Sequence, residues 1–277
     1  MEIANDFKVV DLDKVIKQSD SKLLKSLPKF AVNKIKKIIK QEELNTLYLR
    51  HKEKSGIEFV NGLLQDFNIN LKIEGTENLP KDGKFVFVAN HPLGGIDALA
   101  YLSAIEKFFG KVISPSNELF MYVPNLHPLI VGINVFGRNT KEKISKMNEA
   151  FESDVQIMIF PAGEVSRKIN GKIIDVQWQK TFITKSIQFK RDVIPAFISG
   201  QNTSFFYNLA KIRKNIGIKS YLETFYLPDE MFKKQNTTLV IRFGNPIPYQ
   251  TFDNSKPQSE WAQYVNNMVY SMKPPRN

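Results

Sequence analysis

The residues best suited to chemistry in this chain lie in the stretch Asn90–Asp97, which reads Asn-His-Pro-Leu-Gly-Gly-Ile-Asp. An imidazole with a pKa near 6.5 is a usable general base at neutral pH, so His91 is the first candidate. An aspartate beside a histidine fixes the tautomer of the ring and stabilises its protonated form. Gly94 and Gly95 leave room for a substrate to approach the backbone. We therefore expect His91 and Asp97 to form a catalytic pair; the alternative is a loop histidine beside a helix-capping aspartate.

The remaining candidates for acid–base, nucleophilic or metal chemistry are few. His51 and His127 lack a comparable partner nearby in the sequence, and we expect both to be structural. The chain contains no cysteine, which excludes disulfides, thiolate metal sites and a cysteine nucleophile. The His, Asp and Glu residues show no metal-ligand spacing, so we expect neither a metal nor a bound cofactor.

Three further stretches place polar or small residues at the ends of apolar runs. Residues 132–138 (GINVFGR) end on Arg138, whose guanidinium suits a bidentate grip on phosphate or carboxylate. Residues 160–167 (FPAGEVSR) supply four candidate substrate-binding residues in one turn: Gly163, Glu164, Ser166 and Arg167. Residues 193–197 (VIPAF) form an apolar run that carries a proline. Each stretch alone is a weak indication of a site, because Arg138 could form a surface ion pair and Glu164 could cap a helix.

These stretches must be positioned by an α/β domain, because short apolar runs alternate with segments of helical spacing from about residue 73 onward. The apolar runs predict strands at 84–89, 111–114, 155–160, 193–198 and 239–243. Helical spacing predicts helices at 97–109, 141–151, 179–190 and 259–272. We expect a central, mostly parallel sheet flanked by helices. The His91 loop then lies where a strand ends and a helix begins, a common place for functional residues.

Residues 1–72 are expected to form an N-terminal helical, basic region. Ser21–Lys40 contains seven lysines and no acid, and on a helical wheel its apolar residues share one face. Pro28 is expected to break or bend this helix. A basic amphipathic helix of this kind is typical of an anionic membrane interface. Packing of the apolar face on the protein's own domain is an equally weighted alternative.

The overall charge also bears on partners. The net charge of +11 favours anionic partners: anionic lipid, an acidic carrier protein or nucleic acid. The longest uncharged segment, residues 119–137, is interrupted by Pro124 and Pro128, so we expect no transmembrane helix. The first twenty residues are polar and acidic, so no signal peptide is expected. Without a recognisable nucleic-acid motif, nucleic acid is not expected as a partner.

The order of the four stretches resembles the glycerolipid acyltransferase family, which includes the lysophosphatidic acid acyltransferases. Its members carry an Asn-His loop closed by Asp, a Gly/Phe/Arg block, a Phe-Pro-Glu-Gly-Thr-like block and a Val-Ile-Pro strand. The resemblance covers about Lys84 to Ile198, and the turn at residues 244–247 (GNPI) matches the usual end of the domain. The forms NHPLGG and FPAGEVS are more similar to one branch, which contains the so-called hemolysins and the O-acyltransferases of ornithine and glycine lipids.

The chain departs from the family pattern at two places. Five residues separate His91 from Asp97, where the family has four, so contact between the two side chains has to be tested. In the third block Ala162 stands where Glu is usual and Glu164 where Thr is usual. A phosphate-bearing acceptor prefers positive surroundings, so Glu164 favours an acceptor other than simple glycerol phosphate.

The resemblance implies acyl transfer from a thioester, of acyl carrier protein or coenzyme A, to a lipid hydroxyl. His91 would be the general base, Asp97 would orient it, and Arg138 or Arg167 would anchor the anionic group of the acceptor, a lysolipid or an N-acyl amino acid. We expect a peripheral enzyme on an anionic membrane, at the cytoplasmic face of the inner membrane, catalysing the second acylation in amino-acid-lipid synthesis. The alternatives are a lysophosphatidic acid acyltransferase and a non-catalytic lipid- or acyl-carrier-binding protein.

Overall fold

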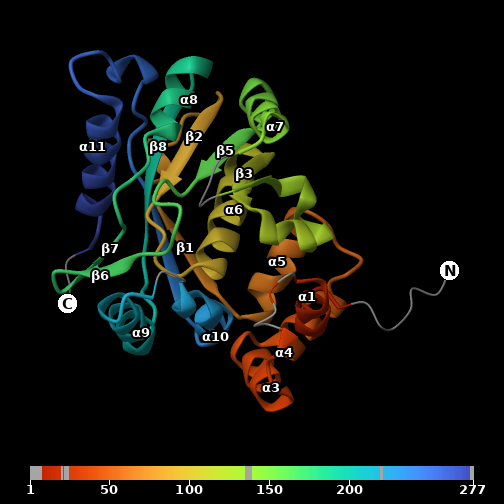
Figure 1. The fold of residues 1–277 in the computed structure, drawn as a ribbon. Helices are drawn as coiled ribbons and strands as arrows, with labels where there is room; N and C mark the ends of the chain where they lie inside the picture. Colours follow the sequence, from red (N-terminus) through yellow and green to blue (C-terminus); the bar gives the residue numbers. More distant parts are fainter. Residues whose placement is uncertain (1–7, 20, 22–24, 135–138, 219–220, 275–277) are drawn as a thin grey trace.

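The architecture is a seven-stranded sheet with helices on both faces (Figure 1). The computed structural model describes residues 8–19, 21, 25–134, 139–218 and 221–274. The strand order is β1-β9-β8-β2-β5-β3-β4, and its neighbours are parallel except for the antiparallel pair β8–β9. The bounds are β1 Asn70–Glu74, β2 Phe85–Ala89, β3 Val112–Asn117, β4 Ile130–Ile133, β5 Gln156–Ile159, β8 Asp192–Ile198 and β9 Thr238–Phe243. The predicted α/β fold with a mostly parallel sheet is confirmed.

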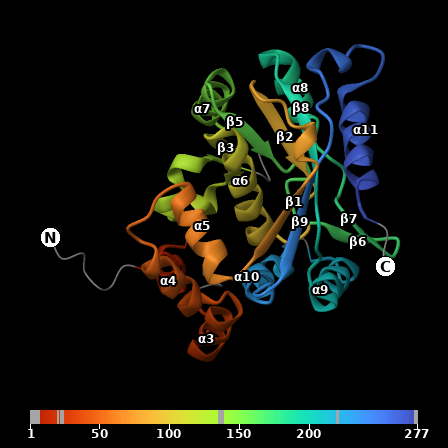
Figure 2. The same cartoon turned by 180° about the vertical axis from the view of Figure 1, so that it is seen from behind.

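The apolar run of β2 shows why the sheet is covered twice. Phe85, Phe87 and Ala89 pack into one hydrophobic core, whereas Val86 and Val88 pack into another. Side chains alternate between the faces of a strand, so a strand buried on both faces reads as a continuous apolar run. Helices α5 (Ile57–Asp66) and α6 (Gly95–Phe109) cover the first face. Helices α7 (Lys141–Glu152), α8 (Thr181–Phe189) and α11 (Gln258–Ser271) cover the second (Figure 2).

The N-terminal region is helical in the part that the structure describes. It contains α1 (Leu12–Gln18), α3 (Lys29–Ile38), α4 (Gln41–Arg50) and α5. Pro28 is the N-cap of α3, so the proline marks the start of the amphipathic helix, while residues 22–24 of the predicted segment lie outside the described residues. The boundary expected at residue 73 falls inside β1, which pairs with β9. Helix α5 packs Phe59 and Val60 into the core of the α/β domain.

Several elements were not expected from the sequence. The uncharged segment from residue 119 forms two short 3₁₀ helices, η2 (Glu118–Tyr122) and η3 (Pro124–Leu129), followed by β4. In the described residues no helix combines the length and apolarity that crossing a membrane requires. The turn after Phe160 continues into a hairpin of β6 (Arg167–Ile169) and β7 (Lys172–Ile174). The other unexpected elements are β1, η1 Thr76–Asn78, α9 Ser204–Asn215, η4 Leu222–Tyr226, α10 Leu227–Phe232 and η5 Tyr249–Thr251.

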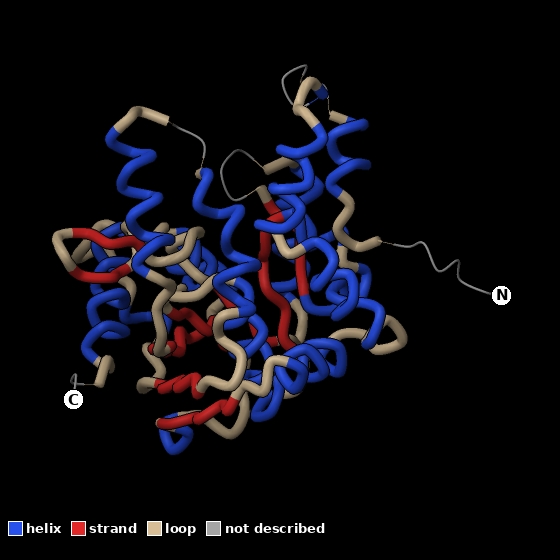
Figure 3. The backbone as a smooth tube through the Cα atoms, turned by 90° about the horizontal axis from the view of Figure 1, so that it is seen from below, coloured by secondary structure: helices blue, strands red, loops and turns tan. Residues whose placement is uncertain are grey.

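One edge of the molecule gathers helices from distant parts of the chain. Helices α3, α9 and α10 all lie at the lower edge in Figures 1 and 2. Figure 3 looks onto this edge from below, where helices and loops surround the strands. Helix α10 packs against the start of α6, because Met231 lies 3.1 Å from where a Cβ on Gly95 would stand. This edge therefore adjoins the loop that carries His91.

Candidate active site

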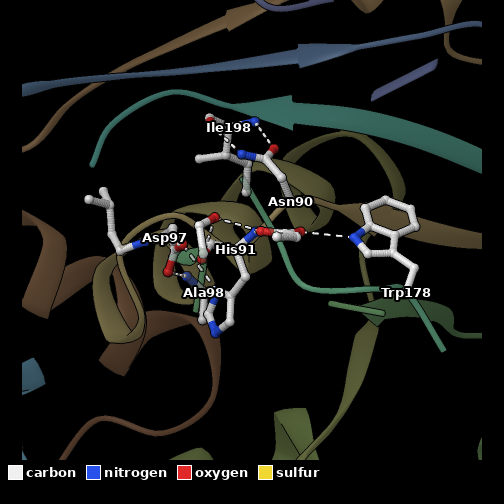
Figure 4. Close-up of polar contacts among 9 residues, drawn as sticks. Asn90, His91, Asp97, Ala98, Trp178 and Ile198 are labelled. Atoms are coloured by element: carbon white, nitrogen blue, oxygen red, sulfur yellow. Dashed lines mark hydrogen bonds and ion pairs between the residues drawn. The ribbon is translucent and has the colours of Figure 1, made fainter. Parts of the chain in front are cut away.

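The imidazole of His91 contacts a carboxylate and an aromatic ring; Figure 4 shows the polar contacts around His91 and Asp97. Its Nδ1 lies 3.1 Å from Oδ2 of Asp97, and its ring stacks on Phe160 with the ring centroids 4.0 Å apart. The His91 side chain is 16% exposed, whereas that of Asp97 is fully buried. Because Nδ1 faces the carboxylate, Nε2 is the nitrogen that can exchange a proton with a substrate.

Asp97 is held by the backbone around it. Its Oδ2 accepts a hydrogen bond from the N–H of Leu93 at 2.8 Å, and its Oδ1 accepts one from the N–H of Ala98 at 3.0 Å. Gly94 has a φ of +96°, a conformation that favours glycine, and it is the N-cap of α6. The turn at Gly94 thus accommodates the five-residue interval, and the two side chains meet.

The charges around the imidazole raise its affinity for a proton. Partial burial lowers the pKa of His91, but the charge of Asp97, its hydrogen bond and the charge of Asp175 together raise that pKa above its ordinary value. Two carboxylates therefore stabilise the imidazolium that forms when the ring accepts a proton. Stabilisation of the protonated ring is one property that a general base requires.

The backbone of His91 is held by a buried carboxylate that the sequence did not single out. Asp175 accepts hydrogen bonds from the N–H of His91 at 3.3 Å, from Ser166 Oγ at 2.5 Å and from Trp178 Nε1 at 2.9 Å. The His91 carbonyl in turn accepts from the N–H of Ser166 at 2.7 Å. Burial raises the pKa of Asp175, and these hydrogen bonds oppose part of the rise. Asp175 therefore joins the His91 loop to the turn that follows β5.

The end of β2 is tied to β8 through Asn90. Its side-chain amide donates to the carbonyl of Ile198 at 2.9 Å, and its Oδ1 accepts from the N–H of the same residue at 2.7 Å. An asparagine that satisfies both backbone groups of one residue acts as an extra rung between the strands. The asparagine of the Asn-His motif therefore positions the loop that carries His91.

The predicted substrate-binding residues occupy different settings. Ser166 is buried, and its hydroxyl donates to Asp175. Glu164 and Arg167 pair with each other at 2.6 Å, and Arg167 also lies 3.3 Å from the buried Glu223. Gly163 is exposed and has a φ of +70°. Arg138 lies outside the described residues. The structure thus brings Ser166 to the back of the His91 loop and joins Glu164 with Arg167 beside it.

The other histidines lie outside this cluster. His51 Nε2 is 3.2 Å from Oδ2 of Asp66, a carboxylate that is not near it in the sequence. The partner is fifteen residues away in the sequence, on α5, and the helical turn brings it close. His127 Nε2 contacts the carbonyl of Met121 at 2.8 Å.

Comparisons with known proteins identify similar chains. The family model described as "Acyltransferase" matches residues 14–276. The lyso-glycine lipid O-acyltransferase of Bacteroides thetaiotaomicron is 43% identical over 265 residues, which cover 95% of this chain and 97% of that protein. The protein of the same name from Phocaeicola vulgatus is 41% identical, with 95% of each chain covered. Among solved structures, the 1-acyl-sn-glycerophosphate (LPA) acyltransferase PlsC of Thermotoga maritima matches with a TM-score of 0.43 and 18% identity, over 89% of this chain and 94% of that chain.

Proposed function

Because the chain belongs to the acyltransferase family and is an enzyme acting on lipids, we propose that it transfers a fatty acyl group from a thioester to the hydroxyl of a lyso-glycine lipid. The observation that carries this proposal is the contact between His91 and Asp97, at the motif by which the chain resembles the family. The name shared by both relatives supports glycine lipid as the acceptor. The reaction is the second acylation in the synthesis of that lipid.

The chemistry follows from the orientation of the imidazole. Nε2 of His91 accepts the proton of the acceptor hydroxyl while the oxygen attacks the thioester carbonyl. Asp97 and Asp175 stabilise the imidazolium that results. The carbon–sulfur bond then breaks, and the imidazolium returns the proton to the leaving thiolate. An ester and a free thiol are the products, and no acyl-enzyme is needed. The donor is acyl carrier protein or coenzyme A.

The start of α6 is suited to the charge that develops during this reaction. The first N–H groups of an α-helix lack partners within the helix and stabilise anions. Asp97 in the first turn of α6 contacts the His91 ring, so this terminus lies beside the imidazole, and we infer that backbone N–H groups here contact the oxyanion. Arg138, Glu164 and Arg167 remain predicted contacts for the acceptor headgroup. The enzyme works peripherally on an anionic membrane, which the net charge of +11 supports.

The test is acyl transfer by the purified protein. An N-acyl glycine whose chain bears a hydroxyl, a lysophosphatidic acid and a radiolabelled acyl thioester are supplied, and products are separated by mass. We expect the diacylated glycine lipid to dominate. His91→Ala should lower the rate at least about 100-fold, because a positioned base contributes roughly that much or more. His127→Ala is the matched control and should retain the rate. Equal rates for His91→Ala and the unaltered protein would exclude this mechanism.

A further inference from the structure

The surface formed by α9 and η4 exposes an unusual number of large apolar side chains. Its members, called here the α9–η4 surface, are Phe205, Ile212, Ile216, Ile218, Tyr221, Leu222 and Phe225. Ile212, Ile216 and Phe225 are 56%, 65% and 52% exposed. Spacings of seven and four residues put the α9 members on one side of the helix, while Phe206 and Tyr207 face inward. Exposed apolar patches of this kind mark interaction sites.

The charge beside these side chains is positive. Helix α9 carries Lys211, Arg213 and Lys214 and contains no acidic residue. Arg213 pairs with the buried Glu223, whereas Lys211 and Lys214 are exposed beside Ile212. Lysines that flank an exposed aliphatic stripe are the pattern of a helix lying in an anionic lipid interface.

A second helix of the same character lies at the same edge of the molecule. Helix α3 exposes 76% of Phe30, carries Lys29, Lys34 and Lys37, and contains no acidic residue. Figures 1 and 2 place α3, α9 and α10 at one edge, and Met231 of α10 contacts the start of α6 at Gly95. Two separate apolar and basic elements on one edge suit an extended planar partner better than a small folded protein.

The α9–η4 surface is also connected to the catalytic loop. The chain passes from η4 directly into α10, where Leu227 lies 3.2 Å from where a Cβ on Gly94 would stand. Arg167, beside the His91 loop, lies 3.3 Å from Glu223 of η4. A lipid held at this surface is therefore close to the site.

We propose that the α9–η4 surface docks the enzyme on an anionic lipid bilayer, so that the membrane-embedded acceptor reaches His91 along α10. Delivery of the acceptor to His91 rests on the proposed function. Binding of the protein to the bilayer does not, because it is measured without acyl transfer. Aliphatic side chains enter the interface and Lys211 and Lys214 contact lipid phosphates, so binding weakens at high salt.

The experiment is co-sedimentation of the full chain with vesicles of phosphatidylglycerol and phosphatidylcholine, and with phosphatidylcholine alone. The unaltered protein should prefer the anionic vesicles. Ile212→Ser combined with Ile216→Ser should weaken binding to the vesicles roughly tenfold. The variant loses the free energy gained when two half-exposed aliphatic side chains move from water into the lipid interface. Lys211→Glu with Lys214→Glu should abolish the preference for phosphatidylglycerol. The matched controls are Ile144→Ser and Lys141→Glu on α7, which lies at the opposite edge in Figures 1 and 2.

Activity separates docking from catalysis. The Ile212/Ile216 variant should lose transfer to acceptor embedded in vesicles but retain transfer to a short-chain acceptor dissolved as monomers. Binding equal to that of the controls would overturn the proposal. Loss of transfer to both the embedded and the dissolved acceptor would also overturn it. The same holds if the variant changes its oligomeric state but not its vesicle binding, or if its activity falls only with acyl carrier protein as the donor. If the protein binds vesicles through the α9–η4 surface but transfers no acyl group, the proposed function is refuted and the proposed docking surface is retained.

Discussion

At the scale of single residues, the site is defined by how completely His91 is restrained. Asp97 and Phe160 fix its ring, while Asp175 and Ser166 fix its backbone. A general base contributes most when its nitrogen is held within hydrogen-bond reach of the proton it removes. These contacts therefore favour one orientation of the ring, with Nε2 directed away from Asp97, and one tautomer of the imidazole.

Replacing Asp97 by Asn tests the electrostatic part of this arrangement. We expect the maximal rate to fall at least about 100-fold, since the imidazolium loses its contact with a carboxylate. The charge of Asp97 raises the pKa of His91, so its removal lowers that pKa. In the proposed mechanism the unprotonated ring is the active form, so the rate should rise as pH passes the pKa of His91. The acidic limb of the pH–rate profile should therefore move to lower pH in Asp97→Asn.

A second histidine–aspartate pair provides the control for that change. Asp66 lies 3.2 Å from His51, outside the site. Asp66→Asn should leave both the rate and the pH profile unaltered. An unchanged profile for Asp97→Asn would show that His91 does not titrate in the reaction.

The sequence was sufficient to predict the pair but not its support. His91 and Asp97 are close along the chain, so their spacing alone suggests contact. Asp175 follows 84 residues after His91 and approaches it only through the packing of the β6–β7 hairpin. Its one sequence signal is an acid within an apolar run, Ile173–Val176, which is weak. The mutual pairing of Glu164 and Arg167 depends on the tight turn before β6 and was equally out of reach.

At the scale of elements, the turn from β2 into α6 decides whether the pair forms. Gly94 has a φ of +96°, and a Cβ on it would lie 3.2 Å from Leu227 and 3.4 Å from Val165. The turn thus requires a backbone conformation that residues with a side chain rarely adopt. A Cβ at this position would also crowd Leu227 and Val165. The spacing of glycines in the sequence indicated a tolerant loop, but not which glycine absorbs the extra residue.

Gly94→Ala should therefore harm activity more than stability alone explains. Backbone strain at such a position costs about 1–3 kcal/mol, and the contact with Leu227 displaces the turn that presents Asp97. We expect a destabilised protein with a rate reduced by at least roughly tenfold, as the His91–Asp97 contact loosens. Chemical denaturation and initial rates measure the two effects separately.

Gly110 is the matched control, because it ends the same helix with a φ of +73° and a Cβ there would meet nothing within 4 Å. Gly110→Ala should cost a similar free energy of unfolding but keep the rate of the unaltered protein. If both variants lose the same fraction of activity, the Gly94 turn has no special role in the site.

The predicted elements differ from the observed ones in an informative way. Strands buried on both faces, such as β2 and β8, were visible as apolar runs. Strand β1 was not, because it lies at the end of the sheet and its residues are half-buried or exposed. Helix α9 was missed because Phe205 and Ile212 are exposed among its polar residues, which obscures the separation into an apolar and a polar face by which a surface helix is recognised.

At the scale of the whole molecule, one buried carboxylate joins the α9–η4 surface to the site. Glu223 of η4 is fully buried between Arg167 and Arg213 of α9. Arg167 directly follows Ser166, which is hydrogen-bonded to the backbone of His91. Arg213 also lies over the ring of Tyr221, 4.7 Å from its centroid. Breaking a buried ion pair on one side leaves its partner charges uncompensated, which is why such groups are costly to alter.

Glu223→Gln should consequently loosen the α9–η4 region from the rest of the protein. We expect a loss of about 3 kcal/mol in the free energy of unfolding, since two guanidinium groups lose their carboxylate. Amide hydrogen exchange should accelerate in α9 and η4 before it does in the central sheet, because these elements are held partly by this group. Glu74→Gln is the control: Glu74 pairs with Arg242 at 2.7 Å but is partly exposed, so its loss should cost about 1 kcal/mol or less. Exchange in α9 that matches the unaltered protein would show that Glu223 does not secure this edge. Accelerated exchange together with retained transfer to a dissolved acceptor would mean that the edge serves docking rather than the chemical step.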